Sequence, residues 1–483
     1  MQAIGLTAVL GFSYAFNSRV LEVTVPYLHI PLLLGFIAGL CALATGNLFQ
    51  TFKTTGGALY LLLTFWFALG VPFAYWSGGS LGHLKTWIIT TLVTWGFITG
   101  LTVTYRECKL LLNTVVLSAT TAAVLSLAGR GSMDREGRLG LEQGRLSNPN
   151  YFALVLLTAL PFIWRWFAGE GTSPGLRRLF TAGLGITATM ALLQTGSRAG
   201  LYGLGVMLIL AILRVDLLRK IQIGFAAAVL LVAAFAALPQ HLQDRYFTFS
   251  STRGDDFANS FDAQVAGAAA GSTLQREQVF RQSISVTLRN PIFGVGLGNF
   301  APYVHQTYVT LDGKMEAYLG THNTYTQISS EGGIPALLIF IAIIVTAWRS
   351  VARLIRATGH DERAEVRDIR RTACAMQVCL GSFLFFLFFI HMGYDPFPHI
   401  MLGLALIVAR TGERELNELN AEQAGTADGG NQKGPAAPAG GIPFRRFAGL
   451  NSRHNMPVAV LGGGASAPVK QGRTALARGS GGR

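Results

Sequence analysis

Long apolar segments separated by short polar connections make up most of this chain. Twelve of them are candidates for the roughly 17–25 helical residues that cross a bilayer. Their approximate cores are 3–16, 31–46, 57–76, 87–104, 110–129, 151–168, 180–196, 199–216, 221–239, 334–352, 373–393 and 397–411. The first and last are short, so ten or eleven spans is the alternative. The pattern predicts an all-α polytopic membrane protein, with nine transmembrane helices in 1–239 and three in 334–412.

Two regions interrupt this pattern. Residues 240–333 form a 94-residue segment between the ninth and tenth spans, which is too long for a simple connection and is therefore a functional candidate. Residues 413–483 are rich in Gly, Ala, Pro and Asn, and such a segment cannot bury enough apolar surface to fold. We therefore predict a large helical loop domain at 240–333 and a disordered tail at 413–483.

The composition agrees with a membrane protein, because 51% of the residues are hydrophobic and 13% are charged. These values exclude a soluble globular domain. Four cysteines are too few for a disulfide scaffold. Internal repeats are not visible, which argues against carriers built from matched halves.

The distribution of Lys and Arg predicts the orientation, because short basic loops stay in the cytoplasm during insertion. The chain carries 39 basic and 25 acidic residues, a net charge of +14. With the N-terminus inside, the cytoplasmic connections hold sixteen Lys and Arg and the opposite short loops hold seven. We therefore expect both termini in the cytoplasm and the 240–333 loop on the outer side of the membrane.

An arginine stands at the outer junction of the seventh and eighth spans, in the sequence LLQTGSRAGLYGLG. Ser197 is a typical N-cap residue, which places Arg198 in the first turn of the next helix. A cation is unfavourable there, because the helix dipole is already positive. An anion bound at that helix end would remove the conflict. We interpret Arg198 as part of an anion site; the alternative is an arginine that merely flanks a span.

A second arginine lies in the long loop, in the helix-like stretch TLQREQVFRQSISVTLRN. Phe280, Ile284 and Leu288 form one stripe at a spacing of four, which is either buried or faces the membrane. Arg276 lies near this stripe, whereas Arg281 is roughly 140° around the helix and should face solvent. Arg276 is either a snorkelling side chain over apolar surface or a functional cation.

Three glycines follow in PIFGVGLGNF, at positions 294, 296 and 298. A dinucleotide fingerprint requires G-x-G-x-x-G between a strand and a helix, and this sequence has neither the spacing nor the context. We expect tight backbone turns that approach a ligand or a neighbouring helix.

A histidine precedes the tenth span in GTHNTYTQISSEGGIPALLIF. His322 and Asn323 stand just before an outer-side helix, with few basic neighbours. A hydrogen-bonded structural histidine is one interpretation. A general base that works near neutral pH is the other.

The outer loop RGSMDREGRLGLEQGRLSNPNYF carries four arginines and three acidic residues. Most of them should form a solvated charge cluster that contributes little individually. Arg145 has no obvious acidic neighbour in the sequence and is a secondary candidate for substrate binding. The turn Asn148-Pro149-Asn150 should start the sixth span.

Metal or nucleotide chemistry has little support in the sequence. Asp255, Asp256 and Asp262 could hold a divalent cation, but no histidine or further carboxylate stands at a ligand spacing. No P-loop and no cysteine set for zinc occurs. We therefore expect no metal and no cofactor, and a substrate that carries its own activation.

These motifs together resemble the O-antigen ligase and polymerase superfamily of bacterial envelope glycosyltransferases. The matching parts are, in order, GRLSNPNYFALVLL, TGSRAG, an arginine followed by PIFGVGLGNF, and HNTYTQISSEGG. The resemblance covers roughly 140–350, whereas the first five spans match by hydropathy alone. Gln278, Val279 and Phe280 depart from the aromatic residue that often follows the loop arginine in this family.

The resemblance implies a GT-C-like fold and an inverting, metal-independent transfer from undecaprenyl diphosphate, with no cofactor. It places the protein in a bacterial inner membrane with the active site facing the periplasm, and it assigns His322 as catalytic base and Arg198 and Arg276 as diphosphate ligands. Asn323, next to His322, is a secondary candidate. An O-antigen ligase would place the glycan on the lipid A core oligosaccharide. The alternatives are an O-antigen polymerase, a protein O-oligosaccharyltransferase, and, from another class, a lipid-linked sugar transporter.

Overall fold

A computed structural model describes residues 1–21, 26–134, 136–142, 144–169, 174–214, 217–247, 261–308, 318–359 and 361–429. The chain divides into two units, Met1–Ala427 and Asp428–Arg483. The fold described below is that of the first unit, which contains every candidate site residue.

Each of the twelve predicted spans falls on a helix of the structure. These helices are α1 (Gln2–Ser18), α3 (Ile30–Ala44), α5 (Thr55–Gly70), α6 (Ser77–Thr86) continued by η3 (Trp87–Leu92) and α7 (Val93–Leu101), α8 (Tyr105–Leu125), α9 (Pro149–Ala168), α10 (Pro174–Gln194), α11 (Arg198–Ile212), α12 (Leu217–Ala236), α16 (Thr324–Thr358), α17 (Ala364–Phe386) and α18 (Pro396–Gly429). The short connecting elements are η1 (Pro26–Leu28), α4 (Asn47–Phe52), η2 (Val71–Phe73), η4 (Ser126–Arg130), η5 (Gly144–Ser147) and η6 (Leu387–Phe389).

Seven helical segments in the described part of the chain are long and apolar enough to cross a membrane, and three shorter apolar helices accompany them. The protein is therefore an all-α polytopic membrane protein. The count of twelve spans stays a prediction, because several of the matching helices are short.

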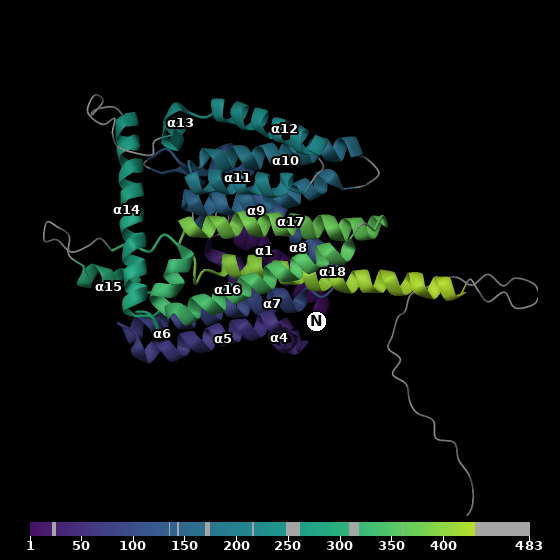
Figure 1. Cartoon of the computed structure of the whole chain (residues 1–483), viewed down its shortest axis with the longest axis horizontal. Helices are drawn as coiled ribbons and strands as arrows, with labels where there is room; N and C mark the ends of the chain where they lie inside the picture. The colour runs from purple at the N-terminus through teal and green to yellow at the C-terminus, as the bar shows by residue number, and fades with distance from the viewer. Residues whose placement is uncertain are drawn as a thin grey trace, which may run out of the picture. The chain divides into compact units, whose positions relative to one another are not determined.

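The helices pack side by side through apolar and small side chains (Figure 1). α1 contacts α3 and α8, α9 contacts α10 and α17, and α16 contacts α5 and α17. Large aromatic side chains fill the space between α5, α7 and α18, where the rings of Tyr60 and Trp95 are tilted by 35° with centroids 4.3 Å apart. Both side chains are buried. This packing fixes the ends of the helices, where the polar residues lie.

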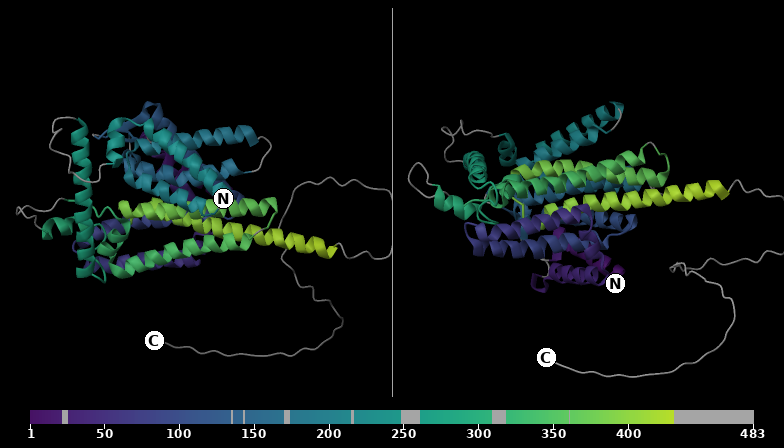
Figure 2. Two further views of the ribbon diagram at one scale, coloured as in Figure 1. Left: turned by 45° about the horizontal axis from the view of Figure 1, so that its top comes forward. Right: turned by 60° about the horizontal axis from the view of Figure 1, so that its bottom comes forward.

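The described part of the region predicted as a loop domain is mostly helical, with non-helical turns at 290–299 and 318–323. It contains α13 (Gln240–Phe247), α14 (Phe261–Arg289) and α15 (Phe300–Thr307), and α14 runs across the ends of the other helices (Figures 1 and 2). Phe280, Ile284 and Leu288 are exposed on α14, so the stripe is not buried in the protein. Arg281 is also exposed, as predicted.

Two features differ from the sequence prediction. The loop between α8 and α9 contains a small antiparallel hairpin, β1 (Gly131–Met133) and β2 (Leu139–Leu141), in which Ser132 is paired with Gly140. Helix α18 continues to Gly429, past the boundary at 412 where we expected the disordered tail. Residues 430–483 of that tail lie outside the described residues.

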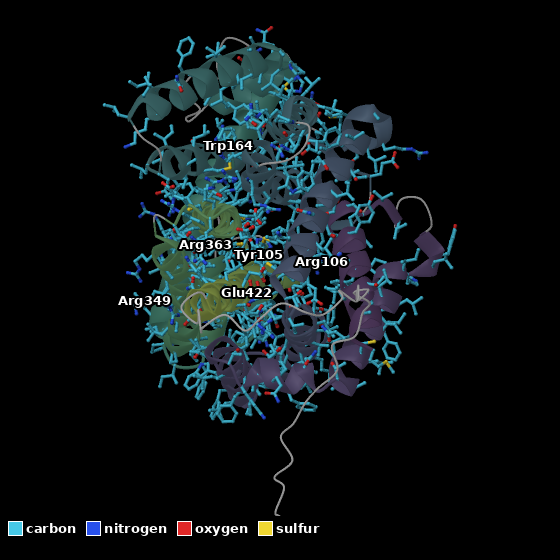
Figure 3. All side chains as sticks on the ribbon, turned by 90° about the vertical axis from the view of Figure 1, so that its right-hand side faces the viewer. Tyr105, Arg106, Trp164, Arg349, Arg363 and Glu422 are labelled. Carbon is cyan, nitrogen blue, oxygen red and sulfur yellow. The ribbon has the colours of Figure 1, made fainter. Side chains whose placement is uncertain are left out.

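Basic residues that we predicted to be cytoplasmic meet at one end of the helices. Figure 3 shows Arg106, Arg349 and Arg363 together at the end that faces away from α14. These residues belong to α8, to α16 and to the N-terminus of α17. The folded chain therefore brings these three cations to the end opposite the candidate site.

Candidate active site

The candidate base stands where the chain enters α16. The side chain of Asn323 caps this helix, because its Oδ1 accepts hydrogen bonds from the backbone N–H groups of Tyr325 and Thr326 at 2.9 and 3.0 Å. His322, just before the cap, has a φ of 50°. A left-handed backbone is uncommon for residues other than glycine and often marks a functional position. The cap and this turn together fix the direction of the His322 side chain.

A second histidine, His391, lies beside His322. It belongs to the short connection between η6 and α18, which is fastened to the start of α16. Thr324 Oγ1 donates to the carbonyl of Ile390 at 2.6 Å, and the backbone N–H of Gly393 donates to Gln327 Oε1 at 2.8 Å. The two imidazole rings meet edge to face with centroids 5.1 Å apart.

A cavity of about 480 Å³ joins the histidine to the loop arginine. Its lining combines polar groups from α14 and the start of α16 with aromatic groups from α14, α17 and η6. The lining residues are Arg276, Glu277, Phe280, Thr321, His322, Asn323, Phe385, Phe388 and Phe389. Phe280 and Phe388 are 40% and 52% exposed, so the apolar side of the cavity is accessible from the surface of the helices. The cavity can accommodate a ligand with a charged end and an apolar end.

Arg276 is the cation on the cavity wall. Its guanidinium is half-buried and makes no hydrogen bond or ion pair with the described residues. Arg281, one turn further along α14, is 77% exposed and pairs with Glu277 at 2.8 Å. The two arginines therefore differ as the sequence predicted: Arg276 faces the cavity and Arg281 faces away from the protein.

Arg198 occupies the first turn of α11. Ser197 is the N-cap, as predicted, and its Oγ accepts a hydrogen bond from the backbone N–H of Gly200 at 3.2 Å. The Arg198 guanidinium donates to the carbonyl of Arg245 through Nε at 3.0 Å and Nη2 at 2.9 Å. Arg198 does not line the 480 Å³ cavity. It lies behind Arg276, close enough for the two charges to interact.

Two more arginines complete a cluster with Arg198 and Arg276. Arg245 is buried in α13, donates to the carbonyl of Gly196 at 3.1 Å and pairs with Glu136. Arg138, from the outer loop, is also buried and donates to the carbonyl of Thr195 at 3.0 Å. The expectation of a solvated cluster was wrong for Arg138, because the connection between α10 and α11 at Thr195 and the start of α9 at Asn150 enclose its guanidinium.

The arginine cluster carries more positive than negative charge. Asp134 and Glu136 are the carboxylates within 4 Å of Arg138. Burial and the charge of Arg245 lower the pKa of Arg138 to about 10, and burial with Arg245 and Arg198 lowers the pKa of Arg276. Both groups stay protonated at neutral pH. The unbalanced charge beside the cavity favours the binding of an anion.

The imidazole of His322 is neutral at physiological pH. Burial, the neighbouring His391 and the charge of Arg276 lower the pKa of His322 to about 4. Burial also lowers the pKa of His391, although Asp395 opposes this effect. A neutral imidazole has a free lone pair, so His322 can accept a proton from a substrate hydroxyl.

The three glycines after α14 support the helix that carries the site. Gly294, Gly296 and Gly298 all have positive φ, between 66° and 93°. The backbone N–H of Gly298 donates to the carboxylate of Glu331 at 2.9 Å, and that of Gly296 donates to the Glu331 carbonyl at 3.0 Å. This confirms tight turns against a neighbouring helix. Helix α16 itself bends at Gly333, whose φ is 79°, so the predicted helix through Glu331 continues into the span with a kink.

Arg145 has an acidic partner that the sequence does not suggest. It forms an ion pair with Asp395, which also accepts a hydrogen bond from Tyr151 Oη at 2.6 Å. Helix α9 begins at the turn Asn148-Pro149-Asn150, as predicted, and Asn148 caps it by accepting from the N–H of Asn150 at 2.9 Å. Arg145 therefore holds the loop of His391 in place and lies outside the cavity lining.

Metal ligands do not gather in the described part of the chain, where no three His, Cys, Asp or Glu side chains form a possible ion site. Asp255 and Asp256 lie outside the described residues, as does the side chain of Asp262. All four cysteines are free.

The sequence analysis did not identify His391, Arg245 or the three phenylalanines of α17 and η6 that line the cavity. A signal existed for His391, because HMGYD places a histidine and an aspartate in the short connection between two spans. Arg245 follows the ninth span directly and could have been considered for the same reason.

The arrangement of the site defines a class of protein: a helical membrane protein with a histidine and clustered arginines around an amphipathic cavity. Residues 183–341, one third of the chain, match the model of the O-antigen ligase family. The match begins within α10 and ends within α16, and it includes Arg198, Arg276 and His322. It confirms the resemblance to the O-antigen ligase and polymerase superfamily and supports a function of that general type. No curated protein matches the chain.

Proposed function

We propose that this protein is an O-antigen ligase that transfers a glycan from undecaprenyl diphosphate to the lipid A core oligosaccharide. The observation that carries the proposal is the lining of one cavity. It contains the neutral His322, the cation of Arg276 and exposed aromatic side chains. A lipid-linked diphosphate has the matching parts, an apolar chain and a strongly anionic head.

The donor enters sideways from the bilayer in this proposal. Phe280 and Phe388 contact its polyprenyl chain, which leaves the diphosphate near Arg276. Arg198 and Arg245 add positive charge behind that position. Preorganised cations stabilise the charge that develops on the diphosphate as the glycosidic bond breaks, without reorganisation during the reaction.

The acceptor hydroxyl reacts next to His322. The imidazole takes the hydroxyl proton while the oxygen attacks the anomeric carbon from the side opposite the diphosphate. The new C–O bond forms as the bond to the phosphate oxygen breaks, so undecaprenyl diphosphate leaves with the bonding electron pair and the anomeric configuration inverts. The lost proton remains on His322 until it passes to solvent. One membrane protein holds both substrates next to each other, and this proximity lowers the barrier of the reaction.

The decisive experiment separates the members of the superfamily. Purified protein is incubated with lipid-linked glycan and, in separate reactions, with lipid A core, with a second lipid-linked glycan, or with pilin, and the products are resolved on gels. Glycan on lipid A core is the expected result. Extension of the lipid-linked glycan would identify a polymerase, and modified pilin a protein O-oligosaccharyltransferase. Movement of the donor across a vesicle membrane without any product would identify a transporter.

A further inference from the structure

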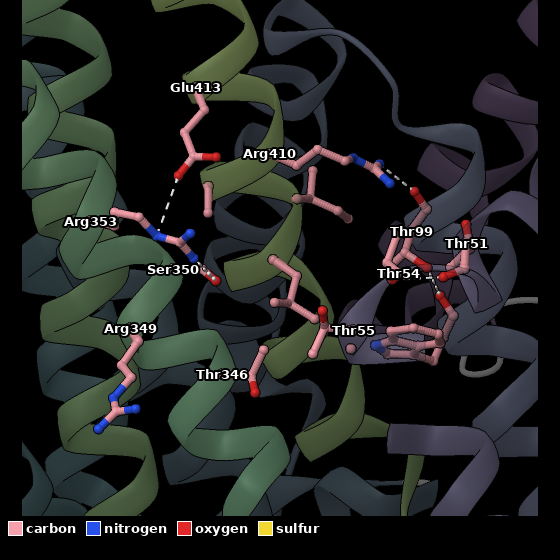
Figure 4. A pocket seen from close by; sticks show the side chains of 15 residues that line it. Thr51, Thr54, Thr55, Thr99, Thr346, Arg349, Ser350, Arg353, Arg410 and Glu413 are labelled. Carbon is pink, nitrogen blue, oxygen red and sulfur yellow. Dashed lines mark hydrogen bonds and ion pairs between the residues drawn. The ribbon is translucent and has the colours of Figure 1, made fainter. Parts of the chain in front are cut away.

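A second cavity lies at the end of the helices opposite the candidate active site. Its volume is about 390 Å³, and it is formed by α4, α5, α7, α16 and α18 (Figure 4). Helix α16 connects the two regions, because it begins beside His322 and reaches this cavity at Arg349, roughly 35 Å further at 1.5 Å per residue. The lining residues are Thr51, Thr54, Thr55, Gly56, Trp95, Thr99, Thr346, Arg349, Ser350, Arg353, Leu406, Ile407, Ala409, Arg410 and Glu413.

The lining carries an excess of positive charge. Arg349 and Arg353 come from α16, and Arg353 donates to Ser350 Oγ at 3.3 Å and lies 3.9 Å from Glu413. Arg410, from α18, donates to the carbonyls of Thr99 and Thr102 at 2.6 and 2.7 Å. The lining therefore contains three arginines and one carboxylate. Figure 4 shows Arg353 and Glu413 on one wall and Thr51, Thr54 and Thr99 on the other.

The threonine wall includes the N-terminus of α5. Thr54 caps this helix, and its Oγ1 accepts from the backbone N–H of Gly57 at 3.1 Å. Thr55 and Gly56, in the first turn, line the cavity. The first backbone N–H groups of a helix have no partner within it and lie at the positive end of the dipole. Such a helix end favours phosphate and other anions.

A buried donor on this lining has no partner. Trp95 is 1% exposed, and its indole N–H makes no hydrogen bond within the described residues. A buried donor without a partner destabilises the fold unless a ligand or water satisfies it. This observation is independent of the charges and of the helix end, and it points to an acceptor group inside the cavity.

We propose that this cavity binds the phosphate group of an anionic membrane lipid. The phosphate interacts with Arg353, the start of α5 and the Trp95 indole, and Arg349 interacts with the outer part of the headgroup. A lipid fits because the cavity lies among apolar helices, with Leu406 and Ile407 in its lining. This site is separate from the proposed transfer reaction and does not depend on it.

The experiment measures retained lipid on the full chain by native mass spectrometry. Detergent-solubilised protein is incubated with phosphatidylglycerol or with phosphatidylcholine. We expect one tightly retained phosphatidylglycerol. Each arginine near a membrane surface strengthens the binding of anionic lipid roughly fivefold, so Arg349→Gln with Arg353→Gln should weaken retention about 25-fold. Trp95→Phe, which removes the indole N–H and keeps an aromatic ring, should weaken it several-fold.

Arg356→Gln is the matched control, because Arg356 is an exposed arginine of α16 outside the cavity lining. Equal losses in the control and the double variant, or equal retention of phosphatidylcholine, would overturn the proposal. Inorganic phosphate serves as a soluble probe in thermal unfolding. Protection by phosphate equal to that by phosphatidylglycerol, and lost in the double variant, would replace the lipid with free phosphate as the ligand. Glycan transfer should stay unchanged in all three variants, whatever its acceptor.

Discussion

The imidazole rings of His322 and His391 meet edge to face at 5.1 Å, although one precedes α16 and the other follows η6. The chain makes this contact through the hydrogen bond from Thr324 to the carbonyl of Ile390. The contact places two basic groups together in a partly buried site that also receives the charge of Arg276. This environment keeps His322 neutral, which is the state that a general base requires.

The first prediction concerns the base. His322→Ala should lower kcat at least about a hundredfold, because positioned proton transfer contributes roughly 10²–10⁴ in rate. His322→Gln should not restore activity, since an amide cannot accept the proton. The measurement is glycan transfer by purified protein, with thermal unfolding as a check on folding. His305→Ala is the matched control, as His305 lies in α15 and does not line the cavity. Near-normal transfer by His322→Ala would remove this residue from the mechanism.

The second prediction compares two arginines of α14. Arg276→Ala should lose most activity, because a charge-assisted contact to diphosphate is about twice as strong as a neutral one. Arg281→Ala should stay within about twofold of the wild type, because an exposed ion pair contributes little. Arg276→Lys should rescue only part of the activity, since lysine lacks the planar fork. Equal losses at the two positions, measured as kcat/KM for the lipid-linked donor, would contradict the site assignment.

The third prediction concerns Arg198, which lies behind the cavity and donates to the carbonyl of Arg245. Arg198→Ala should lower transfer strongly, because it removes positive charge and releases α13 from the start of α11. Arg198→Gln removes the charge and retains hydrogen-bond donors. If the residue acts by charge, both variants should be impaired alike. Full activity in Arg198→Gln would show that its role is to position α13.

The fourth prediction concerns pH. The pKa of His322 is lowered to about 4, so the imidazole is neutral at pH 6–8 and becomes protonated as the pH falls through 4. A protonated imidazole cannot accept a proton, and kcat/KM should therefore be flat from pH 8 to 6 and fall on the acid side. His391→Gln removes a neighbour that disfavours the His322 cation, so it should move the acid limb to higher pH. An unmoved limb in this variant would show that the two rings are not coupled.

The lowered pKa of His322 also predicts how the stability of the fold depends on pH. Unfolded His322 has an ordinary pKa near 6.5, so between about pH 6.5 and 4 the unfolded chain binds more protons than the folded one. Stability contributed by His322 is therefore present above pH 6.5 and lost as the pH falls. Activity measured after return to neutral pH separates this loss from protonation of the base.

The fifth prediction is that transfer needs no divalent metal. The donor already carries a diphosphate leaving group, and arginines are available for its charge. EDTA should leave the rate nearly unchanged, and Asp255→Ala with Asp256→Ala should remain active. In a metal-dependent enzyme the ion would bridge the phosphate oxygens, and its removal would abolish the rate enhancement. Loss of product in EDTA that magnesium or manganese restores would contradict the arginine-based mechanism.

The sequence alone determined the helices, because their formation depends on local properties. Apolar runs of sufficient length, with Ser197 as a cap and the turn at Asn148 as a helix start, placed each predicted span on a helix of the structure. The opposite faces of Arg276 and Arg281 also followed from the sequence, since helical periodicity fixes their angular separation. The positive φ angles of the glycines at 294, 296 and 298 followed from the lack of a side chain.

Only the tertiary structure decided which side chains meet. His391 reaches His322, and Asp395 reaches Arg145, because α17, which leads into their connection, packs beside α9 and α16. Arg138 is buried because another helix end covers it. These contacts join residues far apart in the chain, and no periodicity or local motif encodes them. The pKa of His322 likewise depends on burial and on charges from other elements, so the sequence identified this histidine but not its protonation state.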